Sequence, residues 1–249
     1  MGELYNDIYF GDANKRYSDL ALMAPENWDI PGKSDKALLK NYLNYTYKKL
    51  EEENKIVKRT DYGLFNTGLF TTFYEPIYAY MEPNKAGGTQ KYFLKKFMTP
   101  YELGTIGIID LPERANYFEH PELLVFDAKC KINVQYKHIL SDPNNIVRIP
   151  EEIRDDKNLQ HVLSGAIEMM KMKVTANYKI AVPQYFDHKI QLLLPLCLLN
   201  PDIPDLALVV TKNSKGNYYQ GHTCLTMEMA YNNARLIAKP ESNWLQIRS

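Results

Sequence analysis

The 249-residue sequence predicts an α+β fold in a single domain, residues 1–249, with a mixed or mostly antiparallel sheet and helices packed against it. Three observations favour this class. Apolar residues recur at helical spacing in three segments, and β-branched and aromatic residues cluster in runs separated by turn signals. An apolar content of 45% is ordinary for a globular core, and we found no internal repeat or low-complexity tract.

The helical pattern predicts three helices, over residues 34–54, 155–175 and 227–237. Ser34 is expected to cap the first helix and Thr226 the third, because a side-chain oxygen at this position accepts from a free backbone N–H. The apolar stripe of the second helix is expected to face the core, with Gly165 as a point of close packing.

Strands are expected where β-branched and aromatic residues gather, over residues 56–59, 64–73, 76–80, 105–110, 123–132, 190–199, 205–211 and 218–225. The last two strands are expected to form a hairpin, with its turn at Lys215 and Gly216. Pro195 has no backbone N–H, so its strand must bulge there or have no neighbour on that side.

The segment around Asn66, Thr67, Gly68 and Leu69 is the first candidate for a binding site. A glycine inside a strand usually marks a β-bulge or the close approach of another group to the backbone. If that group is a ligand, the Asn66 amide and the Thr67 hydroxyl stand beside it, so we take Asn66, Thr67 and Gly68 as ligand-binding candidates.

The same tetrad, Asn-Thr-Gly-Leu, resembles the signature of a bacterial domain family of unknown function. The resemblance extends to LALMAPENW at residues 20–28 and to LTMEMAYNNARLIAKPESNWL at residues 225–245, so it covers nearly the whole chain. The family has no established activity. Some of its members carry the domain beside cold-shock-like or other RNA-binding modules, so the resemblance implies RNA or a nucleotide as the partner.

The expected helix over residues 227–237 is the second candidate. One face carries apolar residues, and the other aligns Glu228, Asn232 and Arg235 at helical spacing, with Asn233 beside them. An arginine can bind a phosphate with two hydrogen bonds, and asparagine can contact a base or ribose. We therefore predict one pocket formed by this helix and the tetrad; in the alternative reading, Glu228 and Arg235 are ion pairs that fix the helix to the sheet.

Two patterns leave an enzyme acting on nucleotide or RNA phosphates open. Asp110 and the sequence Asp127-Ala128-Lys129 follow apolar runs, as in metal-dependent nucleases whose carboxylates hold magnesium. His222 is a candidate general acid or base, although a strand histidine can also bond to a backbone carbonyl. A protein-interaction scaffold is a third possibility, and the sequence leaves the presence of catalysis open.

Composition excludes several other classes. Thirty basic and thirty acidic residues cancel, so any RNA contact must depend on local cations such as Lys91, Lys95 and Lys96, with stacking on some of the 19 tyrosines. The five histidines lack metal-ligand spacing, and no nucleotide-cofactor motif occurs, so no metal and no cofactor are expected. No secretory signal or membrane-spanning run is present, which predicts a cytoplasmic protein; the oligomeric state is left open.

Overall fold

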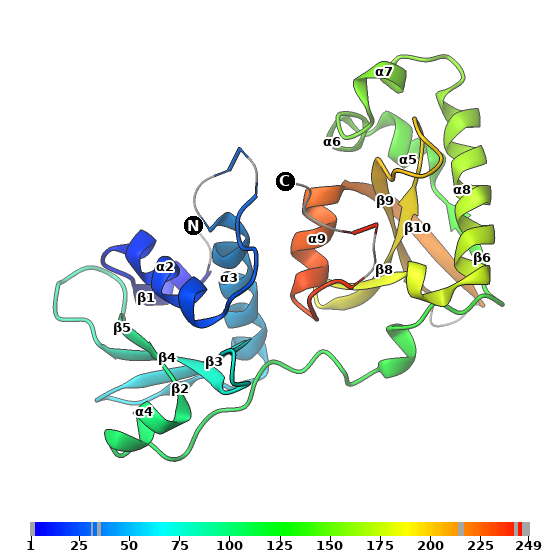
Figure 1. Cartoon of the computed structure of the whole chain (residues 1–249). Coiled ribbons are helices and arrows are strands. Elements are labelled where there is room, and N and C mark those ends of the chain that lie inside the picture. Colours follow the sequence, from blue (N-terminus) through cyan, green and yellow to red (C-terminus); the bar gives the residue numbers. More distant parts are fainter. Residues whose placement is uncertain (1–2, 31, 34–35, 214–216, 242–243, 246–249) are drawn as a thin grey trace. The chain divides into compact units, whose positions relative to one another are not determined.

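The computed structural model of the chain describes residues 3–30, 32–33, 36–213, 217–241 and 244–245 (Figure 1). Contacts between residues divide it into two compact units, Met1–Asn116 and Tyr117–Arg248. Each unit has its own sheet and its own core. The α+β class and the mixed sheets are confirmed, but the strands lie in two sheets rather than one. The assignment of residues 1–249 to a single domain stays a prediction, alongside the observed division into two compact units.

In the described part of the first unit, strands are ordered β1-β5-β4-β3-β2, with β1 parallel to β5 and the other pairs antiparallel. The strands are β1 (Ile8–Tyr9), β2 (Val57–Lys58), β3 (Gly63–Phe70), β4 (Pro76–Pro83) and β5 (Tyr92–Met98). The helices are α1 (Glu3–Asp7), α2 (Ala13–Met23), α3 (Ala37–Glu52) and α4 (Pro100–Thr105).

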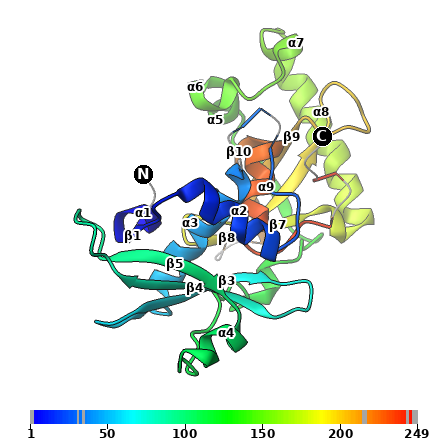
Figure 2. The ribbon, with the colours of Figure 1, turned by 60° about the vertical axis from the view of Figure 1, so that its left-hand side comes forward.

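Helices cover both faces of this sheet. The apolar stripe of α3 is buried, and its Tyr47 ring meets Phe65 of β3 edge-on at 5.2 Å between ring centroids. On the other face, Leu103 of α4 packs with Leu64 and Tyr78 of the sheet. Figure 2 shows the sheet between α3 and α4. Both faces therefore exclude water, which explains why β3 is buried along nearly its whole length.

In the described part of the second unit, the strand order is β6-β10-β9-β8-β7, with β6 parallel to β10 and the other pairs antiparallel. The strands are β6 (Lys131–Val134), β7 (Val182–Phe186), β8 (Lys189–Leu196), β9 (Leu206–Lys212) and β10 (Tyr218–Thr226). The helices are α5 (Tyr136–Ser141), α6 (Pro143–Ile146), α7 (Glu151–Arg154), α8 (Leu159–Ala176) and α9 (Met227–Arg235), with short 3₁₀ turns η1 (Pro121–Leu123) and η2 (Tyr178–Ile180).

The two long helices of this unit lie on opposite faces of its sheet (Figure 1). Leu163 and Ile167 of α8 belong to one apolar cluster with alternate residues of the central strands, among them Leu194 and Leu208. Helix α9 contacts β7, β9 and β10 on the other face. Since neighbouring residues of a strand point to opposite faces, the residues between those of the α8 cluster point toward the α9 side.

The structure confirms most expected elements and corrects others. All three long helices are present, and the Thr226 side chain accepts from Met229 N as the α9 cap; Ser34 and the turn at residues 215–216 lie outside the described residues. The strand expected at 105–110 is wrong: α4 ends there, because Thr99 and Glu102 form a capping box that starts a helix. Of the strand expected at 123–132, only Lys131 and Ile132 belong to one.

Pro195 confirms the expectation of a locally unpaired position. It pairs with Ala207 of β9, whereas the pairing of β8 with β7 ends at Leu193. The missing N–H therefore leaves no ladder bond unmade. In the described part of the chain, no helix combines the length and apolar composition that a membrane crossing requires.

Candidate functional site

A row of polar side chains crosses all the described strands of the second sheet on its α9 side. The strand register places these residues opposite one another, so their side chains share one face. Their exposure rises along the row from the buried Gln184 through three half-buried residues to the exposed Asn133. In strand order from β7 to β6, the row consists of Gln184, Gln191, Thr211, Gln220 and Asn133.

Hydrogen bonds join one end of this row to α9. Asn233 Nδ2 donates to Gln184 Oε1 at 3.1 Å, and Gln184 Nε2 donates to Gln191 Oε1 at 2.8 Å. Gln191 Nε2 in turn donates to Thr211 Oγ1 at 3.0 Å. Asn233, which the sequence marked as ligand-binding, thus orients a chain of amides on the sheet. Such a chain fixes which atoms are donors and acceptors at its exposed end.

A second row lies on the same face and carries aromatic rings and cations. Each of its members is two residues away, along its strand, from a member of the first row. Phe186 pairs with Lys189 across β7 and β8, and Tyr218 pairs with Lys131 across β10 and β6. Phe186 is 52% exposed and both lysines are exposed. Tyr218 is half-buried, and its hydroxyl accepts from Asn213 Nδ2 at 2.8 Å. We call the two rows together the polar face.

His222 lies next to this face, in a β-bulge where the pairing of β10 with β9 shifts between Gly221 and Thr223. Burial lowers the pKa of its imidazole below the ordinary value, and the nearby His138 and Lys189 lower the pKa further. A lowered pKa favours the neutral ring, which is the form that a general base requires.

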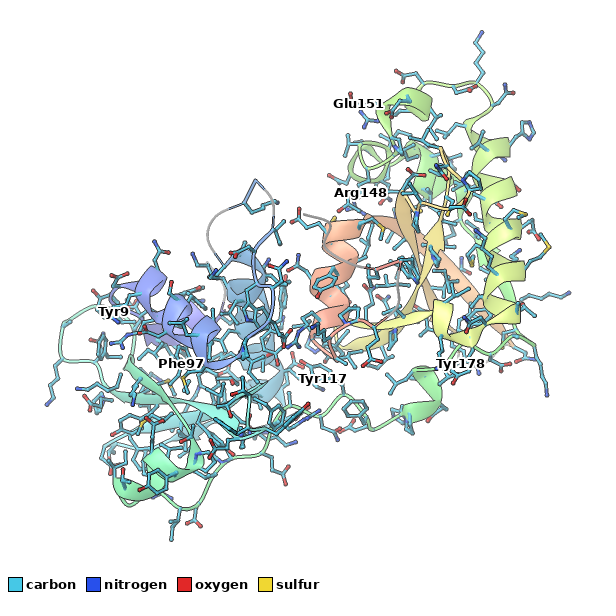
Figure 3. The ribbon with its side chains drawn as sticks, in the orientation of Figure 1. Tyr9, Phe97, Tyr117, Arg148, Glu151 and Tyr178 are labelled. Atoms are coloured by element: carbon cyan, nitrogen blue, oxygen red, sulfur yellow. The ribbon has the colours of Figure 1, made fainter. Side chains whose placement is uncertain are left out.

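Arg148 holds the strand just beyond the bulge. Its Nη1 donates to Thr223 Oγ1 at 3.2 Å and to the Cys224 carbonyl at 2.7 Å, and also to Asn145 Oδ1 at 3.0 Å. Figure 3 labels Arg148 near α6. A rigid clamp of this kind fixes the backbone position of His222.

Two of the other predicted residues of α9 interact with the helix to which they belong, and the third is buried. Asn232 Nδ2 donates to the Glu228 carbonyl one turn earlier at 3.0 Å, and Glu228 lies in the first helical turn, where its charge favours the helix dipole. Arg235 is only 7% exposed. A phosphate therefore cannot reach its guanidinium without rearrangement, which favours the reading of Arg235 as a structural cation.

The tetrad forms a bulge in the first unit, as its glycine predicted. The pairing of β3 with β4 shifts between Asn66 and Phe70, and Gly68 has a φ of 75°. Thr67 is fully buried; its Oγ1 donates to the Ile77 carbonyl at 2.7 Å and accepts from Leu69 N at 3.2 Å. Asn66 Oδ1 accepts from Gly68 N at 2.9 Å.

These bonds engage the tetrad's polar groups within the first unit. Asn66, Thr67 and Gly68 belong to the first unit and Asn232, Asn233 and Arg235 to the second, so each set belongs to its own sheet. The tetrad is thus built as a local turn that satisfies its own backbone, a structural role that the glycine alone could not distinguish from ligand binding.

The residues expected for a nuclease centre lie outside strands. Asp110 follows α4 in the first unit, whereas Asp127 and Lys129 lie in a turn before β6 in the second. Asp127 Oδ1 accepts from Lys129 N at 3.1 Å, and Lys212 Nζ lies 3.1 Å from Asp127 Oδ2. The hydrogen bond from Lys212 lowers the pKa of the Asp127 carboxyl. Among the described residues, no group of three or more His, Cys, Asp or Glu side chains could hold a metal ion.

The basic run at residues 91–97 forms most of β5, a strand that the sequence did not predict. Lys95 pairs with Glu82 at 3.2 Å, and Lys96 pairs with Glu102. Partners of opposite charge leave this strand with little excess charge to attract RNA.

The polar face was missed because its residues are far apart in the sequence. The available signal was the alternation of residue types in single strands, as in β8, where the polar Lys189 and Gln191 flank the apolar Ile190. Only the register of five strands brings them into rows, and β6 and β7 were not predicted with their true bounds.

A model of the family described as "Domain of unknown function (DUF3825)" matches residues 20–244 of this chain. No curated protein and no solved structure matches it.

Proposed function

We propose that this chain, which belongs to the DUF3825 family, binds single-stranded RNA or its nucleotides through the polar face of its second unit. The observation that carries the proposal is the pairing of an amide row with an aromatic and cationic row on one face of one sheet. Single-stranded RNA has unstacked bases, exposed base edges and regularly spaced phosphates, and these groups are complementary to the rings, amides and cations of this face.

The aromatic and cationic row supports affinity. Bases stack on accessible aromatic rings irrespective of sequence, at about 1–3 kcal/mol per base. Phe186 is exposed and Tyr218 is half-buried, so both side chains retain surface that a base can contact. Lys131 and Lys189, opposite these rings, are positioned to neutralise phosphates of the same strand.

The amide row supports selectivity for bases over other anionic ligands. Each glutamine presents both a donor and an acceptor, and so can bond to the Watson–Crick edge of an unpaired base. Gln191 is held by bonds on both sides, whereas Gln220 and Asn133 lie toward the exposed end of the row. We assign base contacts to Gln220 and Asn133.

The test measures binding of a fluorescein-labelled U₁₂ RNA by anisotropy, with purified protein at 50 and 200 mM KCl. The Phe186→Ala and Tyr218→Ala variants are each expected to weaken binding about 5- to 150-fold, the range of one lost stack. Lys131→Ala together with Lys189→Ala is expected to flatten the salt dependence, from a slope of about −1.4 for two phosphates toward zero.

Matched controls separate this face from general surface effects. Tyr178→Ala removes an aromatic residue at η2 whose exposure, 57%, is close to the 52% of Phe186, and Lys157→Ala removes an exposed lysine before α8. Figure 3 labels Tyr178. Both controls are expected to bind like the unaltered protein. Equal loss in Tyr178→Ala and Tyr218→Ala would contradict the proposal, as would failure of the unaltered protein to bind.

One observation favours a second candidate, an enzyme acting on RNA phosphates: His222, whose pKa is lowered, lies two residues from Gln220 in the clamped bulge. End-labelled RNA incubated with the protein, with and without Mg²⁺, tests this candidate. Cleavage that disappears in His222→Asn while RNA binding persists would support it, and intact RNA under both conditions would reject it.

A further inference from the structure

The second unit contains a cavity of about 1,040 Å³ that is separate from the polar face. It lies among α8, the start of β7, the loop from β8 to β9, and residues 237–241 and 244 that follow α9. This volume lies just above the range of about 300–1,000 Å³ that is typical of small-molecule sites. Most of the wall is apolar, contributed among others by Met169, Met170, Ile180, Leu198, Ile237 and Trp244.

The cavity wall exposes side chains that normally avoid water. Met169 is 52% exposed, whereas the next residue of α8, Met170, is buried. Trp244 is half-buried, and its Nε1 donates to the Ile180 carbonyl at 2.8 Å, so the indole is fixed against the wall. A bound apolar molecule would remove this surface from water, and that removal favours binding.

Gly165 provides an independent observation. It lies in the middle of α8, where glycine is less favourable than alanine by about 1 kcal/mol. A Cβ atom there would meet no atom within 4 Å, so close packing does not require the glycine, contrary to the expectation from sequence. The residue lines the cavity, and the missing side chain keeps that part of the wall clear.

The charged residues of the wall indicate the ligand's polar group. Lys173, Lys179 and Lys239 outnumber the two acidic residues, Asp202 and Glu241. Lys173 Nζ donates to the Pro201 carbonyl at 2.8 Å, which fixes one ammonium group beside the β8–β9 loop. An anionic group is therefore favoured over a cationic one in this cavity.

We infer that this cavity binds an amphipathic small molecule, an unbranched hydrocarbon chain that carries one carboxylate. The chain contacts the methionine and tryptophan wall, and the carboxylate lies toward the lysines. This site adds a small-molecule ligand to the proposed RNA binding and does not depend on it.

The two tryptophans of the chain provide the readout. Trp28 is buried in the first unit, whereas Trp244 lines the cavity, so Trp28→Phe leaves one indole that reports on the site. Titration of this variant with 11-bromoundecanoate is expected to quench its fluorescence, because bromine quenches on contact. Trp244→Phe, which retains Trp28, is expected to show no saturable quenching. Quenching that is absent from the first variant, or equal in both, would overturn the inference.

Substitutions at Gly165 in the Trp28→Phe background test the location. Gly165→Leu fills the cavity and is expected to lower affinity at least tenfold, whereas Gly165→Ala leaves room and retains binding. Both residues favour helix more than glycine does, so both variants are expected to fold with a Tm at or above that of the parent. Undiminished binding by Gly165→Leu would overturn the assignment to this cavity.

Competition tests the carboxylate. Undecanoate is expected to displace the brominated probe at lower concentration than undecanol, and Lys239→Gln is expected to reduce that difference about two- to fivefold. Equal displacement by acid and alcohol would overturn the assignment of an anionic ligand.

Discussion

Gly68 of β3 lies so close to Tyr42 of α3 that a Cβ atom on the glycine would come within 2.6 Å of the tyrosine hydroxyl oxygen. The same glycine has a left-handed φ of 75°, which L side chains rarely adopt. The tetrad therefore needs glycine for two separate reasons, backbone conformation and contact with the helix that covers the sheet.

Replacing this glycine is expected to destabilise the first unit. Gly68→Ala should lower the free energy of unfolding by about 2–5 kcal/mol, the sum of the left-handed strain and the steric conflict. Urea unfolding followed by circular dichroism measures the change. The double variant Gly68→Ala, Tyr42→Phe removes the hydroxyl and should recover part of the loss, while strain keeps it less stable than Tyr42→Phe alone. An unchanged unfolding midpoint in Gly68→Ala would refute both parts of the explanation.

The amide chain on the second sheet should stabilise its own unit. Gln184→Leu replaces a side chain that is 1% exposed and leaves Asn233 Nδ2 and Gln191 Oε1 without their partner. A cost of about 1–3 kcal/mol is expected, because buried polar groups would lose their hydrogen bonds. Chemical denaturation gives this value. Gln220→Leu, at a half-buried position of the same row, serves as the control and should cost less than half as much.

The turn between β7 and β8 does not carry the residue pair that suits its conformation best. Asp187 and His188 have φ values of 48° and 60°, so both central positions are left-handed, as in a type I′ turn. The pair Asn-Gly suits this turn best, and Asp187→Asn with His188→Gly should therefore raise stability by about 0.5–1 kcal/mol. Thermal unfolding tests the expectation, and a lower Tm would contradict this assignment of the turn.

The lowered pKa of His222 predicts a dependence of stability on pH. The unfolded chain, with an ordinary histidine pKa of about 6.5, binds a proton at a higher pH than the folded one. Stability contributed by the neutral ring is thus complete above pH 7 and decreases as the pH falls below about 6.5. His222→Gln should reduce the loss of stability between pH 7 and pH 5. His120→Gln, which alters an exposed histidine, should keep the original profile. Identical profiles for His222→Gln and the unaltered protein would show that the imidazole titrates normally.

Much of this architecture follows from the sequence alone, because the relevant forces are local. Apolar spacing determines the helices α3, α8 and α9, and the Thr226 cap sets where α9 begins. The glycine of the tetrad correctly predicted a bulge, since few residues other than glycine adopt its conformation. The absence of a pairing partner on one side of Pro195 likewise follows from its missing backbone N–H.

The tertiary structure alone decides which polar residues are buried and which meet on one surface. Arg235 and Thr67 look like ligand-binding residues in the sequence, yet packing buries both, and nothing in their spacing reports that burial. Gln184, Gln220 and Asn133 come together only because strands distant in the chain pair in one register. The spacing of residues along a helix or strand determines which face of that element each side chain occupies. Which surface of the folded protein that face becomes part of depends on the pairing of segments that are distant in the sequence.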